Sequence, residues 1–156
     1  SNTTRHGFLP KLSGTATEFV NGAGNWATPA AGAHQIATAL STSDTTTTST
    51  SYVDLAAATV TLTTGANPVL VIFTGTFSNT NLAALTYIQV AIDGTLQTGS
   101  EKRFVEPVAS YSMNLATNFV STALSAASHT IKIQWKVDAG TSTCRDTHQI
   151  SVVELK

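Results

Sequence analysis

Charge is what this sequence has least of. Charged side chains make up 11% of the 156 residues, whereas a typical soluble domain has ~25%. Eight Lys and Arg residues against nine Asp and Glu residues leave a formal net charge of −1, and the only adjacent basic pair is Lys102-Arg103. Because nucleic-acid binding needs a basic patch that neutralises phosphates, we do not expect that class of function.

Cysteine and long apolar runs are also scarce. The single cysteine, Cys144, cannot form an internal disulfide, so packing or oligomerisation must hold the fold together. Cys144 follows Gly140 and several Thr and Ser residues, which predicts a loop and an incidental thiol. No apolar run approaches the ~20 residues of a membrane span, and no signal peptide is visible. We therefore expect no membrane insertion.

Motifs of cofactor and catalytic sites are missing as well. The sequence has no G-x-S-x-G, no H-E-x-x-H, no P-loop and no complete dinucleotide fingerprint. The nine acidic residues form no cluster that suggests the paired carboxylates of a glycosidase. We expect no enzyme activity and no cofactor. A metal site is a weak alternative, and His148 near Asp146 is its best candidate.

Thr and Ser take the place of the missing charge, while hydrophobic residues still make up 42% of the chain. Thr is β-branched and suits strands, and its hydroxyl keeps an exposed face wet without charge. A surface of this kind has little charge repulsion to keep copies apart. The composition is compatible with self-association, and equally with an ordinary secreted β domain.

Residues 1–33 differ in texture from the rest. They hold five of the ten glycines and two of the four prolines, and no helical or strand period is sustained. We expect an extended N-terminal neck that joins a shaft and cannot bury a core alone. Its isolated apolar residues would pack against sister copies, and they are Phe8, Leu9, Leu12, Phe19 and Trp26.

Residues 34–156 carry period-two patterns typical of strands. In residues 131–137 apolar side chains alternate with Lys132, Gln134 and Lys136. Asp93-Gly94 is a type I′ hairpin signal. About eight to ten short strands predict an all-β antiparallel β-sandwich, or jelly roll, with one turn of helix allowed at residues 123–128. The expected head core is Val60, Leu62, Val71, Phe73, Ile88, Val90, Ile92, Ile131, Ile133 and Trp135.

Polar, irregular segments mark the candidate contact loops, at residues 78–84, 99–109 and 138–148. Glu101 and Glu106 flank the basic pair and suggest a solvated loop. His129 and Asp93 suggest turn residues. A glycan site would use aromatic faces, for which Trp26, Tyr52, Tyr87 and Tyr111 are available.

Two sets of motifs resemble a known family. Residues 6–29 (HGFLPKLSGTATEFVNGAGNWATP) resemble a phrase that precedes the globular tip in phage tail-fibre and other virion proteins. Residues 52–55 (YVDL), 60–65 (VTLTTG), 69–71 (VLV), 92–94 (IDG) and 128–135 (SHTIKIQW) resemble the C-terminal jelly rolls of phage fibres. Those domains are similar in layout to tumour-necrosis-factor and complement globular-head trimers. The resemblance implies a homotrimer.

The resemblance implies a non-enzymatic viral structural protein on the virion, outside the cell. It would be the tip of a tail fibre or spike that mediates host-surface adhesion. Its partners would be its own copies, an upstream shaft or another virion component, and a host-surface glycan or protein. The alternative is a capsid decoration or virion-stabilising protein of the same fold. A lectin-like module or an enzyme is a third reading.

Overall fold

The computed structural model describes residues 5–6, 9–10, 19–20, 26–27 and 34–156. The chain divides into two units, Ser1–Ala33 and His34–Lys156, with the boundary at the position expected from composition. We call the second unit the head. The first unit contains two short antiparallel backbone pairings, β1 (Arg5–His6) with β2 (Leu9–Pro10) and β3 (Phe19–Val20) with β4 (Trp26–Ala27).

The neck packing expected from the sequence stays a prediction. Phe8 and Leu12 lie outside the described residues. For Leu9, Phe19 and Trp26 the structure describes the backbone only.

The head consists of ten strands joined by turns and loops. They are β5 (Ile36–Ser41), β6 (Thr45–Thr47), β7 (Val53–Thr63), β8 (Val69–Asn79), β9 (Leu85–Ile92), β10 (Thr95–Leu96), β11 (Lys102–Val105), β12 (Met113–Val120), β13 (Ser128–Val137) and β14 (Ser142–Glu154). The helical turn allowed at residues 123–128 is wrong. Residues 123–127 form a loop, and Ser128 begins β13. The loop backbone is held by the residue after β7, because Thr64 N–H donates to Ala127 O at 3.0 Å. Within the described part of the chain, no helix is long and apolar enough to span a membrane.

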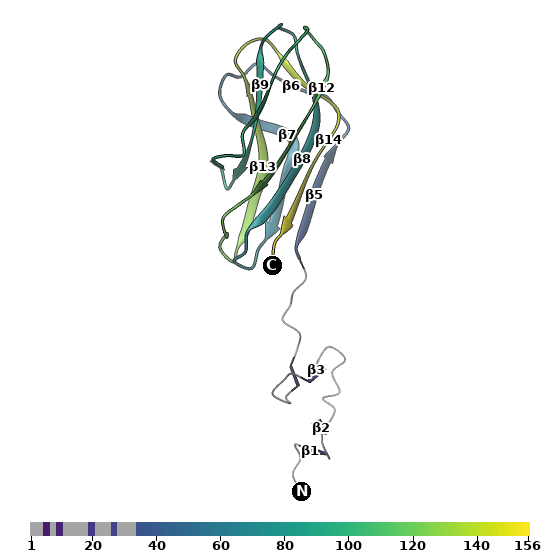
Figure 1. Cartoon of the computed structure of the whole chain (residues 1–156), viewed down its shortest axis with the longest axis vertical. Coiled ribbons are helices and arrows are strands. Elements are labelled where there is room, and N and C mark those ends of the chain that lie inside the picture. The colour runs from purple at the N-terminus through teal and green to yellow at the C-terminus, as the bar shows by residue number, and fades with distance from the viewer. Residues whose placement is uncertain (1–4, 7–8, 11–18, 21–25, 28–33) are drawn as a thin grey trace. The chain divides into compact units, whose positions relative to one another are not determined.

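The strands form two antiparallel sheets that face each other (Figure 1). Sheet I has the order β10-β9-β13-β7, and β11 also pairs with β9. Sheet II has the order β12-β8-β14-β5, and β6 also pairs with β14. From β6 onward the chain passes between the sheets at each connection, except in the run β9-β10-β11. This topology is the predicted jelly-roll β-sandwich.

The core lies between the sheets and follows the period-two pattern. All ten head residues named from the sequence lie in it. Phe77 on β8 meets Trp135 on β13 edge-on, with ring centroids 6.0 Å apart, and so links the two sheets. Such aromatic pairs stabilise a core beyond their buried area. Because each inward residue has two outward neighbours, this packing also fixes which side chains face solvent.

The predicted β9-β10 hairpin is present, with Thr95 and Leu96 as its return strand. Asp93 has φ +50° and Gly94 has φ +79°. Positive φ at both central positions is the requirement of a type I′ turn, which explains Asp-Gly at this position.

The two ends of the sandwich differ. His34 Nδ1 lies 2.8 Å from Glu154 O, and Glu154 N–H donates to Gln35 O at 2.9 Å. The head therefore begins and ends at the same end, which we call the chain-entry end. In Figure 1 the C-terminus and the start of β5 are both seen there. The connections β8-β9, β11-β12 and β13-β14 lie at the opposite end, which we call the loop end.

Replacing Trp135 by Ala should cost ~3–5 kcal/mol of unfolding free energy, because it empties a fully buried aromatic site. That is a large part of the ~5–15 kcal/mol typical of a domain. The matched control is Thr61→Ala on the exposed face of the same sheet, for which we expect less than about 1 kcal/mol. Denaturant unfolding measures both. Equal costs for the two variants would mean that the face assignment of β13 is wrong.

Candidate functional site

At the loop end, a buried carboxylate joins two of the connections. Glu106 is 0% exposed, and its Oε2 accepts the backbone N–H of Asn79. Asn79 Nδ2 in turn donates to Ala139 O at 3.0 Å. The sequence reading of Glu106 as part of a solvated loop is therefore wrong. The residue sits where β8 ends, and its carboxylate satisfies a backbone donor that the sheet leaves unpaired.

The loops expected to make contacts come together only in part. Residues 80–84, 106–109 and 138–141 do meet at the loop end, where Ala83 N–H donates to Glu106 O and Thr80 N–H donates to Thr141 O. Residues 102–105 and 142–148 instead belong to strands β11 and β14.

The correction extends to Cys144, which lies in β14 and is 0% exposed. The preceding Gly and Thr residues suggested a loop, but that loop ends at Ser142. Burial raises the pKa of the Cys144 thiol to about 12, so the thiolate that a nucleophile needs is not formed near neutral pH.

The backbone conformation and close packing of the loop end require glycine at position 140. Its φ is +72°, and a Cβ at this position would lie 2.4 Å from Asn79 Oδ1. Gly94 also has positive φ, but a Cβ there would meet nothing within 4 Å. The two glycines thus share a backbone conformation and differ in the space around them.

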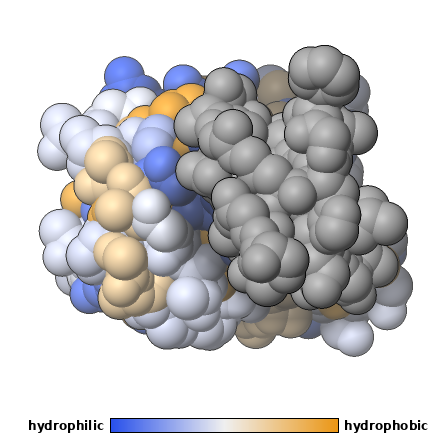
Figure 2. All heavy atoms as spheres, turned by 90° about the horizontal axis from the view of Figure 1, so that it is seen from below, coloured by the Kyte–Doolittle hydropathy of each residue, from blue (hydrophilic) through white to orange (hydrophobic). Residues whose placement is uncertain are grey.

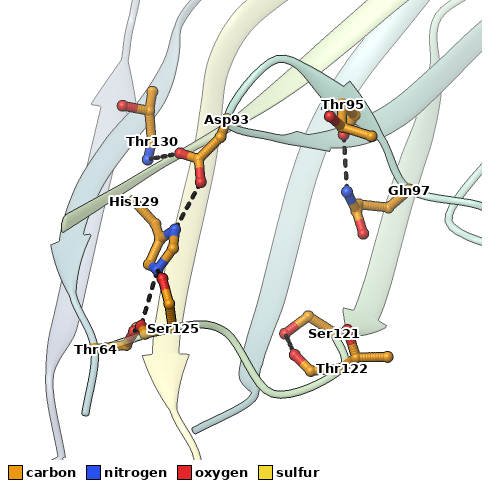
Figure 3. A network of polar contacts seen from close by, with 9 residues as sticks. All are labelled: Thr64, Asp93, Thr95, Gln97, Ser121, Thr122, Ser125, His129 and Thr130. Atoms are coloured by element: carbon orange, nitrogen blue, oxygen red, sulfur yellow. Dashed lines mark hydrogen bonds and ion pairs between the residues drawn. The ribbon is translucent and has the colours of Figure 1, made fainter. Parts of the chain in front are cut away.

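At the chain-entry end, a polar network fixes His129 (Figure 3). His129 Nδ1 lies 2.6 Å from Asp93 Oδ2, and Nε2 lies 3.0 Å from Ser125 O. The other oxygen of Asp93 accepts the Thr130 N–H at 2.8 Å, and Ser125 O also accepts the Thr64 hydroxyl at 2.7 Å. The network ties the β9-β10 turn to the β7-β8 and β12-β13 connections.

This network contains a Ser, a His and an Asp, but its proton arrangement does not suit nucleophilic catalysis. A carbonyl only accepts, so Nε2 of His129 carries a proton directed at Ser125 O. That nitrogen lies 3.3 Å from Ser125 Oγ and cannot also take the hydroxyl proton. The hydrogen bonds to Asp93 and Ser125 raise the pKa of His129, and the bond to His129 lowers that of Asp93. The network is a clamp between loops.

Sequence reasoning placed Asp93 in a turn, which the structure confirms. It also made His129 a turn residue, which is wrong, because His129 lies in β13 and is 7% exposed. No spacing in the sequence joins residues 36 positions apart, so the pair could not be found there.

The fold does not bring together His148 and Asp146, the two candidate metal ligands. His148 is turned into the core, where Nε2 lies 2.9 Å from Ala56 O and the ring packs near Phe73. Asp146 is exposed. Within the described residues, no group of three or more His, Cys, Asp or Glu could hold a metal ion.

The outer face of sheet I carries aromatic and charged side chains. The Lys136 ammonium lies 4.6 Å from the ring centroid of Tyr52 and 4.9 Å from that of Tyr87. Tyr52 donates its hydroxyl to Glu101 Oε2 at 2.6 Å. Partial burial and this bond raise the pKa of Tyr52, so the phenol stays protonated. The tyrosines expected to be available for a glycan are thus joined by a cation, whereas Tyr111 is exposed outside the strands.

The outer face of sheet II carries no charge at twelve consecutive outward positions on its four main strands. In register, they form three rows: Val120, Leu70, Val153 and Ile36; Asn118, Ile72, Ser151 and Thr38; and Ala116, Thr74, Gln149 and Leu40. We call these residues the uncharged face. The first row is entirely aliphatic, and Ile36 in it is 64% exposed. Beyond Gln149 towards the loop end, β14 carries the charged residues Asp146 and Arg145.

The coloured surface in view in Figure 2 reflects the composition. In Figure 2 most of the visible coloured surface is pale, and strong blue is confined to a few places. Pale colours are those of residues such as Thr, Ser and Ala, which the sequence uses in place of charge.

Comparisons with known proteins find solved structures with a similar overall arrangement. No protein-family model and no curated protein matches the chain. Among solved structures, PRD1 vertex protein P5 matches at 11% identity and TM-score 0.47 over 78% of this chain and 97% of that one. A chain of the infectious bursal disease virus Gx strain matches at 10% identity and TM-score 0.46, over 93% of this chain and 36% of its own. Eiger TNF from S. frugiperda matches at 10% identity and TM-score 0.31, over 78% and 94%. At this similarity none of them assigns a function.

The clamp should make stability depend on pH. The raised pKa of His129 gives a contribution that is complete below about pH 6.5 and is lost as pH rises through the folded value. The lowered pKa of Asp93 gives one that is complete above about pH 3.9 and is lost in acid. We expect Asp93→Asn to be most destabilising between those limits and less so in alkali. Chemical unfolding from pH 3 to 9 measures this, and a constant difference from wild type would contradict the assignment.

Gly140→Ala should destabilise the head by at least about 1 kcal/mol more than Gly94→Ala. Both changes impose the strain of positive φ, ~1–2 kcal/mol, but only the first also forces Ala into Asn79. Thermal unfolding of the two single variants provides the comparison. Equal shifts would show that the loop end has room to move.

Proposed function

We propose that this chain is a non-enzymatic virion protein, the trimeric tip of a phage tail fibre or spike that adheres to the host surface. Residues 34–156 are the adhesive head, and residues 1–33 join it to a shaft or another virion component. The partner on the host is a surface glycan or protein.

The observation that carries the proposal is the uncharged face of sheet II. In a threefold-symmetric contact the side chains nearest the axis meet their own copies, so a charge there faces like charges and loses part of its hydration. Charged residues are accordingly depleted from interface cores. Val120, Leu70, Val153 and Ile36 follow one another across this face as an aliphatic row, in which Val120 and Ile36 are exposed and Leu70 and Val153 are half-buried. A second and third copy would cover that row.

The layout of the head favours attachment at one end and adhesion at the other. Residue 34 and the C-terminus lie at the chain-entry end, where hydrogen bonds join His34 and Gln35 to Glu154. The loops held by Glu106 lie at the opposite end. A head attached through its chain-entry end presents those loops away from the attachment. Loops on a rigid sandwich are common sites of recognition.

Residues 6–29 supply the viral part of the proposal, through their resemblance to the phrase that precedes the tip in phage fibres. Several weak sites on a trimer, and several trimers on a virion, would add avidity without a tight single site. No catalytic residue is needed for this mechanism.

The trimer can be tested by solution mass. Size-exclusion chromatography with light scattering should give about three times the 16.2 kDa of one chain. Leu70→Asp, which puts a carboxylate in the middle of the aliphatic row, should shift the mass to that of a monomer. The control is Thr61→Asp on the outer face of sheet I, which should leave the trimer intact. A wild-type monomer, or a Leu70→Asp trimer, would contradict the proposed interface.

The adhesive role can be tested separately with fluorescently labelled protein and host cells. We expect saturable binding that competes with intact virions for adsorption. Protein that binds its own virions but no host cell would instead establish the capsid-decoration role.

A further inference from the structure

We propose that the outer face of sheet I binds an acidic saccharide, through a site built on Tyr52, Lys136, Tyr87 and Arg103. This inference rests on the proposed adhesive function and names the class of ligand. It uses two of the tyrosines that the sequence offers for a glycan, and it places the ligand on a sheet face rather than on the expected contact loops at residues 78–84, 99–109 and 138–148.

The four side chains form one row across the sheet. Lys136 on β13 is in register with Tyr87 on β9, and Tyr87 is in register with Arg103 on β11. Tyr52 immediately precedes Val53, which pairs with Trp135, the neighbour of Lys136. Aromatic and cationic side chains therefore alternate along the row.

Three side chains of the row, those of Tyr52, Lys136 and Tyr87, are held before a ligand arrives. Lys136 lies over both tyrosine rings, and the Tyr52 hydroxyl is held by Glu101. The backbone beneath is a regular ladder of the central strands. Side chains held in this way lose little conformational freedom on binding, which favours a small ligand.

Two cations in the row have no carboxylate partner in the part of the chain that the structure describes. On this face Asp54 is occupied by Lys132 at 2.7 Å, and Glu101 accepts from Tyr52. Among the described residues, neither Lys136 nor Arg103 forms an ion pair, in a protein whose net charge is −1. The row therefore offers positive charge to an outside anion.

The chemistry of the row matches a sugar ring that bears an anionic group. A tyrosine ring can pack on the apolar C–H face of a pyranose, as aromatic side chains do in many ligand sites. The ammonium and guanidinium groups can donate charge-assisted hydrogen bonds to a carboxylate or a phosphate. In the next row, Gln89 and Gln134 lie on the same face, where their amide nitrogens donate to Gln97 O and Asp54 Oδ1.

The charge could belong to a carboxylate or to a phosphate, and the test separates them. The full chain is titrated by NMR with trigalacturonate, with a phosphorylated trisaccharide and with neutral trigalactose. We expect a Kd of about millimolar for at least one acidic probe, weaker binding at higher salt, and at least tenfold weaker binding of trigalactose. The acidic probe that binds identifies the anionic group.

The variants test the residues. Lys136→Met keeps the aliphatic stem and removes the charge, and Arg103→Gln removes the exposed guanidinium. Together they should weaken binding of the acidic probe at least about tenfold. Lys132→Met is the matched control on the same face, because its ammonium is engaged by Asp54, and it should bind nearly as wild type. Unchanged thermal unfolding shows that each variant is folded, and Arg103→Gln alone serves if the double variant is not.

Three results would overturn the site: no acidic probe binds at about ten times the expected Kd, trigalactose binds as tightly, or the folded double variant binds as wild type. The adhesive function is judged independently on host cells. If the double variant still adheres like wild type, the site is wrong and the adhesive function stands. If acidic probes bind through the row but the wild type adheres to no host cell, the site stands and the adhesive function fails.

Discussion

The packing of Phe77 against Trp135 is the contact on which the rest of the head depends. It joins β8 of sheet II to β13 of sheet I at 6.0 Å between ring centroids. Once these two side chains point inward, the period of two sends every second residue of both strands outward. The uncharged face on sheet II and the row of Tyr52, Lys136, Tyr87 and Arg103 on sheet I therefore both depend on which side chains point into the core. A one-residue slip in either strand would exchange core and surface.

The two outer faces have opposite character, which gives them separate roles in our proposal. The uncharged face of sheet II suits contact with identical copies. The face of sheet I keeps cations, carboxylates and tyrosines and suits contact with a different molecule. In our proposal, self-assembly and recognition use different faces of one fold, so a change in ligand preference would leave the assembly surface intact.

The sequence predicted those features that follow from local patterns. Alternation in residues 131–137 gave the inward set of β13, and Asp93-Gly94 gave the type I′ hairpin. The prediction from sequence was wrong where contacts between residues far apart in the chain determine the environment of a side chain. Glu106 looks solvated beside Lys102-Arg103, yet it is buried because the end of β8 comes to meet it. His129 pairs with Asp93 only because their strands are neighbours in the sheet. The row through Lys136 likewise depends on sheet order, which no local pattern contains.

The pairing of β5 and β14, the first and last strands of the head, has an evolutionary consequence. β5 and β14 lie side by side, and Gln35 and Glu154 are hydrogen-bonded at the chain-entry end. A domain whose ends are adjacent can be exchanged, duplicated or inserted as a single unit without moving the segments on either side of it. Recombination between genes could therefore transfer this head as a cassette to another chain.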